Sequence, residues 1–368
     1  MTNRNTLHQN SPRKSNRGLS PIREAYINQK GKRILFLIGS LCCIILLIGY
    51  ATILGSANLT IIEVYSAILG KIFPWVFSGG ELSNAIIWEI RLPRIVMAII
   101  AGAGLALAGA VMQGVLQNPL AEPFTLGISS AAASGAAIAI VTGAGLIGGP
   151  FLIIGNAFVF AMAATALVYL LAQCRGMTPE SMILSGIAIM FFLNAITSIV
   201  QYIGTPEQVE AVVFWMMGNL GKSTWGMITT TSILLGICAP ILYFKAVDIN
   251  IIGSGDETAT SLGIHVERAR IICMVLAALI TAGFTAFTGV IGFVGLIAPH
   301  ITRMLIGGDN RYVLPGSALV GSIILLSADT AARTIISPII LPVGVMTAVL
   351  GVPFFLFLFL RQKKQFWY

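Results

Sequence analysis

Three arginines border long apolar stretches of this sequence: Arg91 and Arg94 precede one stretch, and Arg333 precedes another. A guanidinium group stays charged and donates hydrogen bonds in a rigid fork, so these residues are suited to electrostatic recognition rather than to catalysis. Glu89 flanks Arg91, and Asp329 precedes Arg333 by one helical turn, a spacing that permits an ion pair. Local ion pairing is therefore the first interpretation of this group.

A second polar group is the segment Gly255-Asp-Glu-Thr-Ala-Thr-Ser-Leu-Gly263, which begins with the acidic residues Asp256 and Glu257. The spacing of Ala259 and Leu262 predicts a short amphipathic helix that ends at Gly263, because glycine tolerates the backbone of a helix C-terminus. The alternative is a solvated connector, since polar loops of this length are common.

A third group lies within the apolar stretch 181–206, where Asn194, Ser198 and Gln201 share one face of the predicted helix. Polar side chains in a membrane helix face either a wet cavity or a neighbouring helix. Both interpretations stay open, the first being that this face lines a pathway and the second that it bonds to another helix.

Neither a metal site nor a catalytic site is indicated. His8, His265 and His300 are scattered without the spacing of metal ligands, so we expect no metal and no cofactor. The segment 143–148 matches a dinucleotide fingerprint but follows no strand, and the phosphate-loop-like segment 218–223 lacks the required upstream glycine. We therefore expect that the chain is not an enzyme and has no ATPase site of its own.

The composition indicates an all-α protein embedded in a membrane, because 57% of its 368 residues are hydrophobic and only 10% are charged. The stretches free of charge predict one crossing each in 34–62, 95–121, 181–206, 223–244 and 334–360, and a short crossing in 312–328. We divide 123–174 at Gly148-Gly149-Pro150, and 271–302 at Thr288–Gly292, into two helices each. The total is about ten transmembrane helices.

An even number of crossings places both termini on one side, and 17 of the 22 lysines and arginines then fall on that face. The positive-inside rule makes it the cytoplasmic one, so the net charge of +8 reflects topology and not nucleic-acid binding. We expect a disordered basic tail at 1–33 that contacts membrane lipid, a transmembrane domain at 34–361 and a cytoplasmic tail at 362–368.

Four segments together resemble the permease subunits of ABC importers for iron-siderophores, haem and vitamin B12, a family with the type II importer fold. They run from Arg91 to Gly127, from Gly292 to Arg303, from Asp309 to Pro315 and from Leu341 to Pro353. The resemblance covers most of the chain from Trp88 to Leu360.

The resemblance implies a multi-pass protein of the bacterial inner membrane that dimerises with itself or with a related permease. Its partners would be cytoplasmic ABC ATPase subunits, an extracytoplasmic binding protein and a metal-chelate substrate, for which we expect a ferric siderophore. In this second interpretation, Arg91, Arg94 and Arg333 dock the binding protein. The segment with Asp256, Glu257, Ala259, Leu262 and Gly263 becomes the ATPase-coupling helix, and the helices at 181–206 and 341–360 line the pathway.

Haem and cobalamin stay open as substrates because the family shares its motifs among all three cargoes. Two rival classes fit less well. An ion-coupled transporter would place an acidic residue at the centre of a span, and a membrane-embedded enzyme would need a His, Asp or Glu constellation at the interface.

Overall fold

The computed structural model describes residues 21–55, 60–72, 75 and 80–361, and within these ranges every regular element is a helix. Seven of the described helical segments are long and apolar enough to cross a membrane, and three shorter apolar helices accompany them. The predicted all-α membrane class is confirmed. The total of ten crossings stays a prediction, because the three shorter helices span only if the bilayer is thin around them or if they are partly covered by protein.

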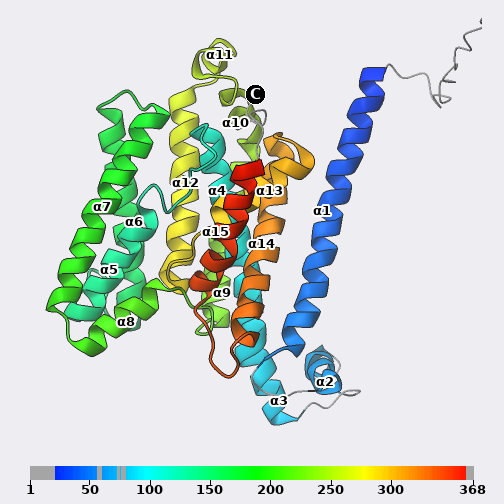
Figure 1. The fold of residues 1–368 in the computed structure, drawn as a ribbon, viewed down its shortest axis with the longest axis vertical. Helices are drawn as coiled ribbons and strands as arrows, with labels where there is room; N and C mark the ends of the chain where they lie inside the picture. Colours follow the sequence, from blue (N-terminus) through cyan, green and yellow to red (C-terminus); the bar gives the residue numbers. More distant parts are fainter. Residues whose placement is uncertain (1–20, 56–59, 73–74, 76–79, 362–368) are drawn as a thin grey trace, which may run out of the picture.

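The helices follow one another with short connections, in the order shown in Figure 1. Their bounds are α1 Pro21–Ile53, α2 Ile61–Ile72, α3 Glu81–Ala85, η1 Ile86–Arg91, α4 Leu92–Val115, α5 Ile128–Thr142, η2 Gly149–Phe151, α6 Leu152–Gln173, α7 Pro179–Ile203, α8 Pro206–Met216, α9 Trp225–Phe244, α10 Ala246–Ile252, α11 Asp256–Ser261, α12 Val266–Thr288, α13 Val294–Ile306, α14 Asn310–Thr334 and α15 Val343–Arg361.

Both predicted divisions occur in the structure. The stretch 123–174 contains α5 and α6 with a turn at Gly143–Phe151 between them, and α12 ends at Thr288 before α13 begins at Val294. Helix α5 ends at Gly143 because this glycine adopts a left-handed backbone conformation.

Two predicted boundaries differ from the structure. The crossing at 312–328 was expected to be short, but α14 runs for 25 residues because Arg333 and Asp329 continue the helix as an internally paired turn. At the N-terminus, α1 already begins at Pro21, so residues 21–33 of the predicted tail are helical. The remaining tail residues, 1–20 and 362–368, lie outside the described part of the chain.

Helix α4 forms the centre of the bundle and packs against α12, α13 and α14. Small residues permit this packing, since a Cβ atom at Gly102 would lie 2.4 Å from the carbonyl oxygen of Gly321, and one at Gly109 would lie 1.9 Å from that of Gly295. Lipid supplies no hydrophobic drive between helices, so close backbone contact of this kind is what holds the body together.

The two ends of the bundle carry different elements, as Figure 1 shows. The first turn of α1, the last turn of α15 and the short helices α10 and α11 lie at one end. Helices α2, α3 and α8 lie at the other. The described termini of the chain therefore share the end that carries α11, which agrees with an even number of crossings.

Candidate functional sites

The three arginines at the α3 end are buried around one carboxylate. Nε of Arg94 lies 2.8 Å from Asp329, and Nε of Arg333 lies 3.1 Å from the other oxygen of the same side chain, which is fully buried. The predicted ion pair between Asp329 and Arg333 is present, and Arg94 joins it from the neighbouring helix α4. We call Arg91, Arg94, Arg333 and Asp329 the arginine cluster.

The arginine cluster also closes the end of α1. Arg91 donates to the carbonyl oxygens of Thr52 and Ile53 at 2.7 and 3.0 Å, and Arg333 donates to the carbonyl of Leu54 at 3.1 Å. The last carbonyls of a helix have no partner within the helix and carry partial negative charge, so guanidinium groups stabilise them. All three arginines are less than a tenth exposed, and their role in docking stays a prediction.

At the opposite end, the structure confirms a short helix, α11, in the polar segment. Ala259 is fully buried against Ile252, Val266 and Ala269, whereas Leu262 is 64% exposed. Gly263 follows with a left-handed φ of +84° and open space around it. The helix therefore presents an apolar side chain outward at its C-terminus. Glu257 is exposed on the same helix, and Asp256 pairs with Arg270.

The polar side chains of α7 lie in two environments, a buried one at Thr197 and a more exposed one at the predicted face of Asn194, Ser198 and Gln201. Thr197 is buried and shares a 2.7 Å hydrogen bond with Ser134 of α5, as an interhelical contact requires. Asn194 and Ser198 are exposed and Gln201 is half-buried. Asn194 and Ser198 are covered by nothing in the described chain and Gln201 is covered only in part, so this face is available to a pathway, to another subunit or to lipid.

The sequence did not indicate a cavity of about 260 Å³ between α13, α14 and α15. Its walls are apolar, with Phe293, Ile297 and Phe354 among them, and Ser327 and Thr347 supply hydroxyl groups. The only sequence signal was the assignment of the last helix to the pathway by family resemblance. Three helices that are distant in sequence build the cavity, which is why no local pattern predicted it.

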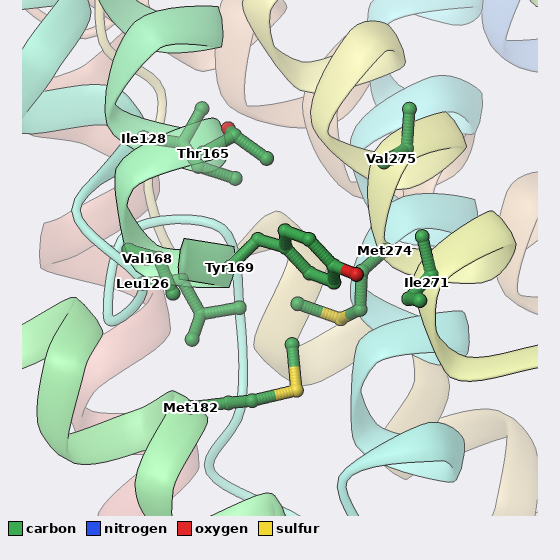
Figure 2. A pocket seen from close by; sticks show the side chains of 9 residues that line it. All are labelled: Leu126, Ile128, Thr165, Val168, Tyr169, Met182, Ile271, Met274 and Val275. Carbon is green, nitrogen blue, oxygen red and sulfur yellow. The ribbon is translucent and has the colours of Figure 1, made fainter. Parts of the chain in front are cut away.

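A second hollow, between α5, α6, α7 and α12, is too small to hold a substrate. Figure 2 shows Tyr169 of α6 reaching across it toward Met274 of α12, with Met182 below. Its volume of about 20 Å³ is roughly that of one water molecule. We interpret it as a gap in packing.

Two motif segments that are far apart in sequence meet at the break between α12 and α13. The side-chain amide of Gln113 donates to the carbonyls of Gly295 and Leu296 at 3.4 and 3.3 Å, and Arg303 donates to Gln113 and to the carbonyl of Ala110. Two of the four motif segments therefore bond to each other, and their polar residues hold α13 against α4.

Glu122 lies in the loop between α4 and α5, outside the spanning helices. It accepts a hydrogen bond from the backbone N–H of Phe293, which is distant in sequence. Burial raises the pKa of Glu122 to about 7, and this hydrogen bond opposes the shift.

Comparison with known proteins identifies relatives along nearly the whole chain. The model of the FecCD transport family matches residues 42–361. A hemin transport system permease of Yersinia pestis is 38% identical over 85% of this chain and 92% of its own length. An Fe(3+)-citrate import system permease of Bacillus subtilis strain 168 is 36% identical over 90% and 96%.

A cobalamin import system permease of Halobacterium salinarum is 39% identical over 79% of this chain and 77% of its own length. Among solved structures, an inward-facing ABC transporter described as of metal-chelate type superposes with a TM-score of 0.78 at 29% identity. It covers 89% of this chain and 99% of its own.

Proposed function

This chain belongs to the FecCD transport family, and we propose that it forms one half of the pathway by which an ATP-driven importer carries a ferric siderophore across the membrane. At the coarser level, it is an integral membrane permease of an ABC importer of the metal-chelate, haem, cobalamin or siderophore type. This family assignment excludes the rival interpretation that the chain is an ion-coupled secondary transporter.

The observation that carries the proposal is the apolar cavity between α13, α14 and α15. Its volume of about 260 Å³ is below the range of roughly 300 to 1,000 Å³ that small-molecule pockets occupy. We propose that a second permease subunit, a copy of this chain or a related one, completes the pathway. The uncovered residues Asn194, Ser198 and Gln201 of α7 would line the same route.

The two ends of the bundle support the remaining assignments. We propose that the end with α11 faces the cytoplasm, where Leu262 enters a slot on an ATPase subunit and both termini lie. The end with α3 then faces outward and receives the binding protein near the arginine cluster. Three guanidinium groups and one carboxylate leave that cluster net positive, which favours an acidic partner even though its side chains are buried.

Transport by the reconstituted importer tests the function. The chain, its ATPase and its binding protein are placed in proteoliposomes and supplied in turn with a ferric hydroxamate, ferric citrate, haemin and cobalamin. We expect ATP-dependent uptake of a ferric siderophore. Uptake of haemin or cobalamin instead would replace the substrate and keep the permease role, and uptake that persists without ATPase would overturn both.

Docking requires a separate test because the arginines also stabilise the fold. Arg91→Gln removes one charge and keeps hydrogen-bond donors toward α1. The control Lys222→Gln removes one exposed charge from the same end of the helix bundle. We expect the first change, more than the second, to weaken association with the binding protein, and the difference to shrink at high salt. Equal effects at every salt concentration would contradict docking at the arginine cluster.

A further inference from the structure

Arg270, which no motif marked, is a buried arginine in the second turn of α12 and is only 2% exposed. One guanidinium group contacts three separate parts of the chain. It donates to both carboxylate oxygens of Asp256 at 3.0 and 3.1 Å, to the carbonyl of Met177 at 2.9 Å and to the carbonyl of Val115 at 3.4 Å.

Each of these contacts lies at the end of a helix. Asp256 is the first residue of α11, and Val115 is the last residue of α4. Met177 lies in the turn between α6 and α7 and has a left-handed φ of +54°, two residues before α7 begins. Arg270 therefore joins the short helix α11 to the central helix and to the start of α7.

The rest of α11 contacts a much smaller part of the molecule. Its buried residue Ala259 packs in a small apolar cluster formed by α10, α11 and α12. The helix also contacts the body of the bundle through the ion pair between Asp256 and Arg270. A displacement of α11 would thus reach the start of α7 through this guanidinium, and α4 both through it and through α10, which packs against α11 and α4.

We propose that Arg270 is a positioning residue that transmits movement of α11 to the inner ends of α4 and α7. This inference rests on the proposed function, in which α11 receives the movement of the ATPase. The choice of arginine follows from its geometry, because a planar fork with five donors can hold a carboxylate and two carbonyls in fixed directions, whereas a lysine ammonium cannot.

Two substitutions separate this role from a general loss of stability. Asp256→Asn leaves Arg270 and its carbonyl contacts in place and weakens only the link to α11. The Asp256 side chain is 45% exposed, so the variant is expected to fold. Arg270→Gln removes all three contacts. Arg268→Gln is the matched control, since it removes the same charge from an exposed position on the same helix.

Distances between spin labels at Ser261 of α11 and Glu180 of α7 measure the link directly. Both positions are exposed, and the labels are placed in a cysteine-free chain assembled with its ATPase. We expect this distance to stay unchanged when ATP is trapped with vanadate in the parent and in Arg268→Gln, and to change in Asp256→Asn and Arg270→Gln. A nucleotide-dependent change in the parent, or none in either variant, would overturn the proposal.

The rate of ATP hydrolysis provides a second measurement. Substitution of a residue with a purely structural role would not change it in the way we expect for Asp256→Asn. We expect the stimulation of ATP hydrolysis by the binding protein, taken as a ratio to each variant's own basal rate, to fall about tenfold in Asp256→Asn and to stay at the parent value in Arg268→Gln. If stimulation survives in Asp256→Asn, Arg270 does not transmit movement. Failure of the unsubstituted chain to bind any ATPase would instead remove the proposed function itself.

Discussion

At the end of the bundle that carries α3, three arginines are buried around Asp329 and the last carbonyls of α1. At the opposite end, Arg270 is buried in a similar way around Asp256 and two carbonyls, but Leu262 at the end of α11 is exposed. Both ends use arginine as an internal clamp. They differ in what stands beside the clamp: the arginine cluster is buried, whereas α11 ends at the exposed side chain of Leu262.

The difference separates two kinds of contact with partners. A protein that binds at the arginine cluster meets a positive potential and a rigid surface, since the guanidinium groups already have partners. A protein that binds at α11 gains apolar burial from Leu262. Substitutions in the buried arginine cluster should therefore alter stability before association, and substitutions of the exposed Leu262 should alter association alone.

The largest effect is expected at Asp329. Asp329→Ala leaves Arg94 and Arg333 as buried charges without their shared carboxylate, and breaking a buried pair in this way costs about 3 to 5 kcal/mol. Thermal unfolding of the purified chain in detergent measures the loss. Glu89→Ala, at an exposed position of the same end, is the control. Similar unfolding temperatures for the two variants would show that the arginine cluster is not a clamp.

Glu122 is a buried acid without an arginine partner in the described chain. One backbone amide donates to its side chain, whereas Asp329 is paired with two arginines. Its pKa rises from 4.5 to about 7 on burial, so the folded chain binds the proton more tightly than the unfolded chain. Stability should be greatest below pH 4.5 and should fall as the pH rises to about 7, by about 3 kcal/mol in all.

Glu122→Gln should remove this slope, whereas Glu180→Gln, at an exposed position, should keep it. Unfolding measured across pH 4 to 8 checks both variants. A slope that survives in Glu122→Gln would assign the dependence to another group.

Leu262→Asp tests the α11 end. We expect association with the ATPase to weaken by about 2 kcal/mol, which is near thirtyfold, while the unfolding temperature stays unchanged because the residue is exposed. Thr260→Asp adds the same charge to the same helix and serves as the control. Co-purification of the ATPase with each variant gives the result, and equal recovery of ATPase would exclude Leu262 from the interface.

The smallest effect is expected at Gly263. Valine disfavours its φ of +84° by about 1 to 2 kcal/mol, which should shift the end of α11 and weaken ATPase association several-fold. Gly176→Val is the matched control, because that glycine has a φ of +82° and equally open surroundings in another turn. If both variants bind the ATPase equally well, the end of α11 does not contribute to binding.

Much of the fold could be predicted from local patterns. The absence of charge marked the spanning stretches, and glycine or proline marked where α5 and α12 end. The length of α14 was wrong because its last turn contains Asp329 and Arg333, which read as polar residues outside the membrane until their pairing is known. A hydropathy pattern records the type of each residue and not its partner.

For the candidate sites, too, some features follow from local sequence and others only from the packing of distant segments. The sequence by itself determined the membrane class, the short helix at Asp256–Ser261 and its terminal glycine, because period, charge and backbone preference are local properties. Only the tertiary structure decided that Arg91, Arg94 and Arg333 are buried, that Arg270 joins three helix ends and that α13, α14 and α15 line an apolar pocket. Burial and pairing depend on which distant segments come together, and packing of the whole chain determines that.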